Sequence, residues 1–206
     1  MKIITISREF GSGGRELGKR LADELNFAYY DREIITEIAK KSEMDEEYIE
    51  NILDNGFSQN FPLSFARTFS YTTTIQPNMT QLLVAQHQII KEIAAKEDCI
   101  IVGRNANFIL KDQNPLNLFV YADIDSKLKR CREKANQDAS LSDSELLKQI
   151  KQVDNLRAKQ QAFLTNAKWG EKENYHLCIN TSGLNLKELT PKIADYARFW
   201  FGGVNK

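Results

Sequence analysis

The sequence predicts an α/β fold in which helices cover both faces of a five-stranded parallel sheet. Two observations lead to this prediction. Five short apolar runs recur along the chain and lack the polar alternation of a strand with one solvated face, which is typical of strands covered on both sides. Longer helical patterns lie between the runs, and alternating strands and helices favour parallel pairing with right-handed crossovers.

The apolar runs give the predicted strands. Each run is short enough for a strand and too short for a helix of ordinary length. They are "KIITI" (2–6), "FAYY" (27–30), "CIIVG" (99–103), "LNLFVYA" (116–122) and "HLCIN" (176–180).

Amphipathic periodicity gives the predicted helices. In the first of them, Leu17, Leu21 and Leu25 fall on one face and charged residues fall elsewhere. The helix after the fourth strand is expected to be capped by Asp125 or Ser126. The predicted helices span residues 14–26, 79–96, 125–135, 142–164 and 186–200, and two further helical patterns lie within 32–76.

Length and composition bound the class of protein. A chain of 206 residues, 42% apolar and 27% charged, is expected to form one globular domain over 1–206. Lys+Arg and Asp+Glu are 28 each, so no global field attracts nucleic acid or an acidic membrane. Three scattered cysteines (Cys99, Cys131, Cys178) form no CxxC pair, and the chain shows no signal sequence and no membrane-spanning apolar stretch. These features favour a reduced, cytoplasmic protein.

A glycine-rich segment, "SREFGSGGRE", joins the first strand to the first helix, with Ser7 as the expected start of the loop. Gly11, Gly13 and Gly14 permit positive φ and a close approach of ligand to backbone. The loop ends at a helix N-terminus, where free N–H groups and the helix dipole favour an anion. Arg15 adds a cation there. The alternative interpretation is a glycine-rich turn that binds nothing.

Two nucleotide-binding motifs compete for this loop. The dinucleotide motif G-x-G-x-x-G fails because Glu16 replaces the third glycine and the turn after the strand is too long. The phosphate-loop motif G-x-x-x-x-G-K-[ST] tolerates a longer loop. In that motif Arg15 stands at the lysine and Glu16 at the hydroxyl residue that meets magnesium, so the match is degenerate.

The wider sequence resembles the cytidylate kinase-like family. Members of that family carry an S-R-x-[FY]-G-S-G-G-R-E loop followed by Y-D-R-E, and this chain has "SREFGSGGRE" and "YDRE". An ungapped comparison with true cytidylate kinase loops places Gly14 at the phosphate-loop lysine and Glu16 at the hydroxyl residue. Further matches follow in consistent order: "IIVGRNANFIL" (100–110), "LFVYADIDSKLKRCREK" (118–134), D-x-x-R (Asp154, Arg157) and "WGEKENYHLCINTS" (169–182).

The resemblance implies a three-layer P-loop NTPase-type fold with a five-stranded parallel sheet. It also implies a helical acceptor-binding region over about 32–80 and a lid over about 134–174. The implied activity is that of a nucleoside-monophosphate kinase, with ATP and Mg²⁺ as cofactors and CMP, dCMP or a related small acceptor as substrate. Because the loop lacks the lysine and the Ser/Thr, the alternative is a nucleotide-binding module of the same fold with little or no catalysis.

The resemblance and the phosphate chemistry together assign the donor side of the site. Arg15, Arg130 and Arg157 are the expected catalytic cations, because arginine forks clamp phosphate oxygens. Asp154 is expected to orient Arg157 within the lid from one turn away. The loop residues expected to cradle the donor phosphates are Gly11, Ser12, Gly13, Gly14, Arg15 and Glu16.

On the acceptor side, Arg104 matches the arginine that grips the acceptor monophosphate, and Asp31 matches the acid near the acceptor nucleoside. Magnesium ligands are not identified by any motif, and Glu16, Asp31 and Ser12 are the conjectured ones.

One aromatic segment has two interpretations. Four phenylalanines recur at four-residue spacing and would form one stripe on a helix. The first interpretation is a packing face in the core or between subunits, and the second is a wall of a base-binding cavity. The expected partner is a nucleotide or another small-molecule substrate, and neither nucleic acid nor membrane. The packing interpretation adds the alternative of an oligomer formed through the stripe. The stripe consists of Phe57, Phe61, Phe65 and Phe69.

Overall fold

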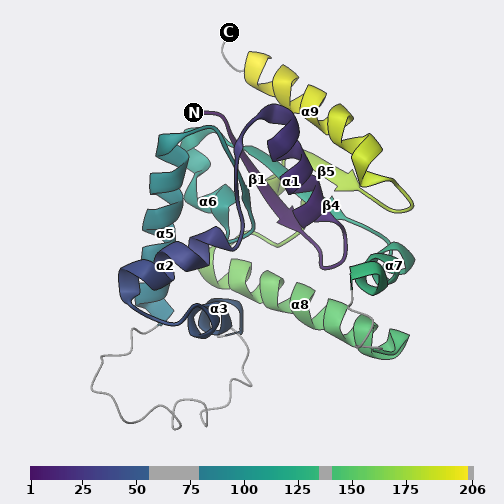
Figure 1. The fold of residues 1–206 in the computed structure, drawn as a ribbon, viewed down its shortest axis with the longest axis horizontal. Helices are drawn as coiled ribbons and strands as arrows, with labels where there is room; N and C mark the ends of the chain where they lie inside the picture. The colour runs from purple at the N-terminus through teal and green to yellow at the C-terminus, as the bar shows by residue number, and fades with distance from the viewer. Residues whose placement is uncertain (56–78, 135–140, 204–206) are drawn as a thin grey trace.

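Five parallel strands form one sheet in the computed structural model, which describes residues 1–55, 79–134 and 141–203. Their order across the sheet is β2-β3-β1-β4-β5, so β1 is central (Figure 1). The predicted fold class is confirmed. The strands are β1 (Ile3–Arg8), β2 (Ala28–Tyr30), β3 (Cys99–Val102), β4 (Leu116–Tyr121) and β5 (Leu177–Asn180).

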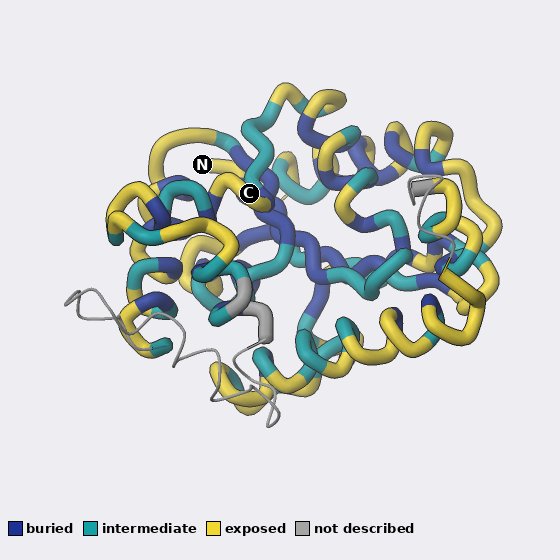
Figure 2. The backbone as a smooth tube through the Cα atoms, turned by 60° about the horizontal axis from the view of Figure 1, so that its bottom comes forward, coloured by how far each residue is buried: buried dark blue, intermediate teal, exposed yellow. Residues whose placement is uncertain are grey.

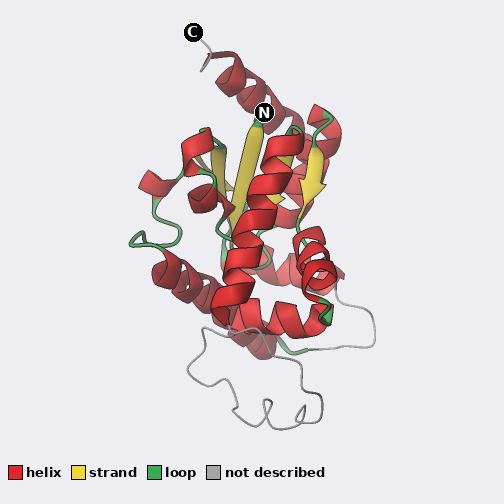
Figure 3. Cartoon of the chain, turned by 90° about the vertical axis from the view of Figure 1, so that its left-hand side faces the viewer, coloured by secondary structure: helices red, strands yellow, loops and turns green. Residues whose placement is uncertain are grey.

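Helices surround the sheet, and Figure 3 shows the strands enclosed between them. Those in the described residues lie close to the predicted ranges, with α5 matching its range at both ends, except that the short helix α6 was not predicted. They are α1 (Gly14–Leu25), α2 (Glu33–Ser42), α3 (Glu46–Asn55), α5 (Met79–Lys96), α6 (Ala106–Ile109), α7 (Ile124–Lys134), α8 (Asp143–Leu164) and α9 (Leu186–Gly203).

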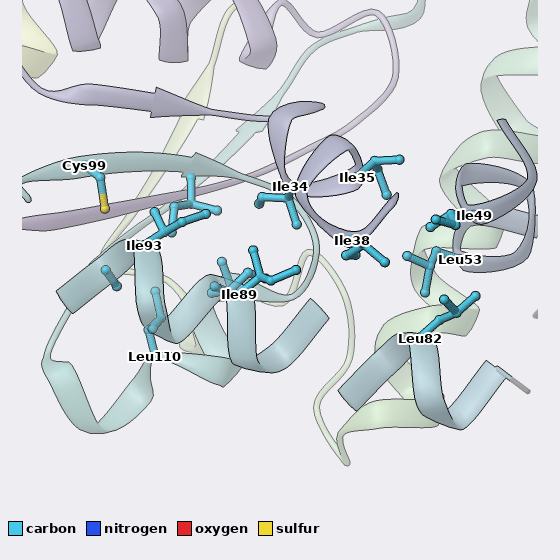
Figure 4. Close-up of a cluster of buried hydrophobic side chains, with 14 of the residues drawn as sticks. Ile34, Ile35, Ile38, Ile49, Leu53, Leu82, Ile89, Ile93, Cys99 and Leu110 are labelled. Carbon is cyan, nitrogen blue, oxygen red and sulfur yellow. The ribbon is translucent and has the colours of Figure 1, made fainter. Parts of the chain in front are cut away.

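Successive side chains of β1 point to opposite faces of the sheet and join two separate apolar clusters. Ile4 and Ile6 are buried with side chains of α1 and α9. Ile3 is buried with side chains of α2, α3 and α5, and Figure 4 shows Ile34 and Ile89 of this cluster. The interior strands are accordingly buried along most of their length, whereas the outer turns of the helices are exposed (Figure 2). Cover on both faces is the reason that the strands lack polar alternation.

The first strand is longer than predicted. Ser7 and Arg8 continue the parallel pairing with β4, opposite Phe119 and Val120. The predicted loop start at Ser7 is therefore wrong, and the connection to α1 consists of Glu9–Gly13. The cause is tertiary, because the pairing with β4 continues past the end of the apolar run. Polar residues such as Ser7 and Arg8 can take part in it, since the pairing uses main-chain groups.

The cap of α7 also differs from the prediction. The helix begins at Ile124, and the carboxylate of Asp123 accepts the N–H of Ser126 at 2.7 Å. The capping residue is therefore Asp123 instead of Asp125 or Ser126. The bonds to Ser126 and Ser182 lower the pKa of the Asp123 carboxyl, because they stabilise its ionised form.

Some predictions fall outside the described residues. The phenylalanine stripe (Phe57, Phe61, Phe65, Phe69) lies there, as does the start of the expected lid region, 135–140. Among the helices that are described, none is long and apolar enough to cross a membrane.

His176 gives the fold a testable pH dependence. Its Nδ1 accepts the N–H of Asn117 at 3.0 Å, and its ring centroid lies 4.3 Å from that of Trp200. Partial burial lowers the pKa of His176 below its ordinary value of about 6.5. The unfolded chain therefore binds the proton more readily, so the free energy of unfolding should decrease as the pH falls through about 6.5.

Urea unfolding between pH 8 and pH 5 measures this effect. The variant His176→Gln should show a smaller loss of unfolding free energy on acidification than the wild type. His87→Gln, at an exposed position of α5, should keep the wild-type slope. Parallel pH profiles for wild type and His176→Gln would contradict the assignment.

Candidate active site

The carboxyl ends of the parallel strands meet at one edge of the sheet, and α8 crosses this edge (Figure 1). Arg8 ends β1, Asp31 directly follows β2, and Arg104 comes two residues after β3. From α8, Asp154 and Arg157 reach the same place. Open α/β sheets bind ligands at this edge, so the predicted site residues from separate segments do come together.

The loop between β1 and α1 closes on itself at Ser12. Gly11 and Gly13 have φ values of +76° and +83°, which side chains other than glycine rarely adopt. The hydroxyl of Ser12 donates to the carbonyl of Glu9 at 2.8 Å, and Ser12 is fully buried. In this structure the Ser12 hydroxyl therefore shapes the turn and does not face a cavity.

Several loop amides remain open. Within the described residues, no acceptor takes the N–H of Gly11, Gly13, Gly14 or Arg15, whereas the N–H of Ser12 bonds to Glu9 at 3.3 Å. The N-cap of α1 also makes no side-chain bond to these amides. Open N–H groups and the positive end of a helix dipole favour an anion, so the loop keeps the character of a phosphate-binding loop.

A cavity of about 370 Å³ lies against this loop and is called here the loop cavity. Phe10, Gly11 and Gly13 contribute the loop side, and Leu146 of α8 and Cys131 of α7 contribute the opposite side. The open amides and the cavity therefore occupy the same part of the molecule.

A second cavity of about 730 Å³ lies between the edge of the sheet and helix α3, and is called here the α3 cavity. It is lined by Glu46 and Glu50 of α3, by Leu156 of α8 and by Arg104. The backbone around Arg104 is unusual, because Gly103, Arg104 and Asn105 all have positive φ (+78°, +56° and +53°). For residues other than glycine this conformation costs energy, and such strained residues cluster at active sites and ligand-binding loops.

The two cavities share a wall of three arginines. Arg8, Arg15 and Arg157 line both the loop cavity and the α3 cavity. They come from β1, from the first turn of α1 and from α8. A charged group placed between the two cavities would therefore meet cations from three separate elements.

Asp31 is the carboxylate closest to this wall. It is buried, forms an ion pair with Arg15, and lies 3.9 Å from a guanidinium nitrogen of Arg8. The residue expected on the acceptor side therefore holds a residue expected on the donor side. This pair neutralises Arg15 while no anion is present.

Two side chains of α8 bond to the main chain at the end of β1 and in the loop that follows it. Asp154 accepts the N–H of Phe10 at 2.7 Å, and Arg157 donates to the carbonyl of Arg8 at 2.9 Å. The two α8 side chains lie 3.5 Å apart. The D-x-x-R pair thus positions the helix and the loop together, and burial raises the pKa of the Asp154 carboxyl.

Lys127 of α7 is a site residue that sequence reasoning missed. Its side chain is only 8% exposed, and its Nζ lies 2.7 Å from Glu9 and 3.4 Å from Asp154. Glu9, also missed, accepts the N–H of Ala122 at 3.2 Å as well. A helical face carrying Lys127 one turn before Arg130 was the signal available in the sequence.

Arg130 lies beside the loop, but its guanidinium faces carbonyl oxygens. It donates to the carbonyls of Thr181 at 2.5 Å and Ser12 at 3.5 Å. The hydroxyl of Thr181 donates to the same Ser12 carbonyl at 2.7 Å. In this structure Arg130 therefore joins the loop to the chain after β5, and its predicted catalytic role remains a prediction.

The acids of the site do not form a metal centre. Glu16 pairs with Arg20 at 3.0 Å, Asp31 pairs with Arg15, and Glu9 pairs with Lys127. Among the described residues, no group of three or more His, Cys, Asp or Glu side chains is placed to hold a metal ion. The described residues therefore do not fit a magnesium ion that is held by protein side chains alone.

A parallel sheet with β1 at its centre, a glycine loop opening on a helix N-terminus and arginines at the carboxyl edge are the features of the P-loop fold of nucleoside-monophosphate kinase type. The chain belongs to the cytidylate kinase-like family, whose model matches residues 3–183. The resemblance seen in the sequence is thereby confirmed. No curated protein matches the chain.

Solved structures agree with this fold. An uncharacterized protein from Eubacterium ventriosum is 26% identical, with a TM-score of 0.67 over 96% of this chain and 99% of that chain. A shikimate kinase from Bacteroides thetaiotaomicron is 15% identical, with a TM-score of 0.56 over 96% of this chain and 98% of that chain. The second likeness concerns the fold alone.

Proposed function

We propose that this protein transfers the γ-phosphoryl group of ATP to CMP, dCMP or a related small acceptor that carries a phosphate. Membership of a kinase-like family supports phosphoryl transfer in general. The observation that supports this arrangement most is the wall shared by the two cavities, formed by Arg8, Arg15 and Arg157. A donor in the loop cavity and an acceptor in the α3 cavity would meet at that wall.

The reaction needs positioning and charge neutralisation more than covalent chemistry from the protein. An oxygen of the acceptor phosphate forms a bond to the γ-phosphorus, and the bond from that phosphorus to the β-phosphate oxygen breaks. ADP leaves, and the acceptor becomes a diphosphate. A dianionic acceptor phosphate has no proton to lose, so this step requires no general base. Arginines at the wall would stabilise the charge on the transferred group.

The parts of the site take distinct roles in this proposal. The open amides of the loop hold the donor phosphates, and Arg104 holds the acceptor phosphate. Arg15 is paired with Asp31 without a ligand and turns to the phosphates when nucleotide binds. The Asp31 carboxylate can then accept a hydrogen bond from a hydroxyl or amino group of the acceptor.

A nucleotide-binding module without catalysis is the second candidate. Gly14 stands where the phosphate loop has its lysine, and Arg15 is held in an ion pair. Both observations favour binding without turnover, because they leave fewer cations free for the transition state.

A coupled assay separates the two candidates. ADP release from Mg·ATP is measured over a panel of CMP, dCMP, UMP, AMP and shikimate, and ATP binding is measured by calorimetry. ADP release that depends on a monophosphate and yields an equal amount of diphosphate supports the kinase. Turnover at the level of the buffer blank, together with measurable ATP binding, supports the binding module.

Arg104→Ala is expected to weaken the binding of the acceptor and to leave the binding of ATP nearly unchanged. Its side chain lines the α3 cavity, so the KM for the acceptor should rise roughly 10- to 100-fold, the value of one or two charge-assisted hydrogen bonds. The KM for ATP should change little. Lys111→Ala, at an exposed position in the 3₁₀ turn after α6, is the control. Equal losses for both nucleotides would show that Arg104 does not serve the acceptor.

A further inference from the structure

Arg8 differs from the other charged residues of the site because its guanidinium has few hydrogen-bond acceptors near it. Its side chain is 17% exposed, and the nearest carboxylate, Asp31, lies 3.9 Å away, beyond hydrogen-bonding distance. Among the described residues, nothing accepts a hydrogen bond from its guanidinium. A guanidinium carries several N–H donors in a rigid fork that matches the oxygens of a phosphate, and Arg8 lines both cavities. A bound anion would satisfy these donors.

The surroundings of Arg8 hold an excess of positive charge. Arg157, Arg104 and Arg15 all act on it unfavourably, whereas Asp31 is its favourable partner and is already paired with Arg15. Burial, followed by these neighbours, lowers the pKa of Arg8 to about 9, and the group still carries its charge at pH 7. The chain as a whole is neutral, so this excess is local. A multiply charged phosphate between the two cavities would relieve the repulsion.

Two glycines make room for the Arg8 side chain. A Cβ atom on Gly14 would lie 2.5 Å from the Cβ of Arg8, which is closer than real Cβ atoms approach one another. A Cβ atom on Gly103 would collide with Nη1 of the guanidinium. The side chain therefore passes from the end of β1, beside the start of α1, toward the chain after β3. Either glycine could carry a side chain only if Arg8 moved.

The position of Gly14 gives this packing its meaning. In the ungapped comparison with cytidylate kinase loops, Gly14 stands at the phosphate-loop lysine. A lysine at that position would start from the Cβ that is missing in Gly14, and Arg8 starts 2.5 Å from that point. The side chain of Arg8 therefore begins at nearly the same point in space as the lysine of a phosphate loop would, although Arg8 comes six residues earlier in the chain. Gly14 is small because Arg8 occupies the neighbouring volume.

We propose that Arg8 replaces the missing phosphate-loop lysine and contacts the γ-phosphoryl group of the donor from the wall between the loop cavity and the α3 cavity. This inference rests on the proposed phosphotransferase function and names the cation that the loop itself lacks. Arg8 would then be a catalytic residue, because it touches the group that is transferred. Arg15 and Arg157 line the same wall and complete the set of cations.

The first test removes the charge. Arg8→Met should lower turnover about 10²-fold or more, the range found when one donor to a developing charge is deleted. Since the contact is with the γ-phosphoryl, the ratio of ATP affinity to ADP affinity should fall toward one. Arg198→Met, an exposed arginine of α9 far from the site, should keep the wild-type turnover and ratio. Unchanged turnover and an unchanged ratio in folded Arg8→Met would overturn the proposal.

The second test moves the cation back. Arg8→Gly removes the two atoms that a Cβ at position 14 would meet most closely and leaves the Val120 Cβ at 3.2 Å. Gly14 does not have a positive φ, so the backbone there allows a lysine once Val120 shifts by a few tenths of an ångström. The double variant Arg8→Gly/Gly14→Lys should regain a higher ATP-to-ADP affinity ratio and a higher turnover than Arg8→Gly alone. A double variant that is no better than Arg8→Gly overturns the proposal. This comparison decides the matter if Arg8→Met does not fold.

Calorimetry separates this inference from the proposed function. If the wild type shows no turnover with any acceptor, the phosphotransferase function fails, and the ATP-to-ADP affinity ratio of the variants still decides the role of Arg8. If the wild type turns over and Arg8→Met equals it, the function stands and the inference fails.

Discussion

Replacing Arg157 with alanine is expected to lower turnover about 10²-fold or more and to leave the KM values for ATP and acceptor within a few-fold of the wild type. Arg157 lines both cavities from α8, so it is placed to meet charge that develops on a phosphoryl group between them. An interaction made mainly in the transition state affects turnover more than ground-state binding. Steady-state kinetics with varied ATP and varied acceptor measure both quantities.

Two variants control this experiment. Lys159→Ala removes an exposed cation from the same helix and should behave as the wild type. Arg157→Lys keeps the charge and loses the planar fork, so it should recover only part of the turnover. Because Arg157 also donates to the Arg8 carbonyl at 2.9 Å, urea unfolding must show that the alanine variant is folded. A folded alanine variant with wild-type turnover would make Arg157 a structural residue.

Replacing Lys127 with methionine is expected to lower the free energy of unfolding by about 2–3 kcal/mol. Methionine has a similar length, so the loss is mainly of charge. Glu9 and Asp154 would then be left in a largely buried place without the cation that lies 2.7 Å and 3.4 Å from them. Removing one partner of a buried ionic group lowers the stability by more than the intact group adds to it, because the remaining charges are left buried without a counter-charge. Urea unfolding monitored by circular dichroism measures the change.

The matched control is Lys129→Met, since Lys129 lies on the same helix and is exposed. It should change the free energy of unfolding by no more than about 0.5 kcal/mol. Adding Glu9→Gln and Asp154→Asn to Lys127→Met should recover part of the lost stability, because the unpaired charges are then absent. If Lys127→Met and Lys129→Met unfold at the same urea concentration, the buried network contributes nothing.

Sequence patterns predicted the parts of this protein that follow from short-range chemistry. Apolar runs marked the strands, and the 79–96 pattern matched α5 at both ends. The family resemblance assigned Asp31 and Arg104 to the acceptor side, and the structure brings both to the carboxyl edge of the parallel sheet.

The parts that the sequence did not predict depend on neighbours distant in the chain. Arg8 belongs to a strand because β4 lies beside it, and its side chain has space because Gly14 and Gly103 come from two other elements. No periodicity within residues 7–16 records either fact. Likewise, no sequence pattern indicated that the guanidinium of Arg130 donates to the carbonyls of Ser12 and Thr181.

The sequence by itself determined the fold class, the family and the edge of the sheet at which ligands are expected. Only the tertiary structure decided which charged side chains are buried there and with which partners. Lys127 and Lys129 show the difference, because they are the same residue type two positions apart, and one is buried between two carboxylates while the other is exposed. The physical reason is that a charge leaves water only where opposite charges from other elements are already placed to receive it.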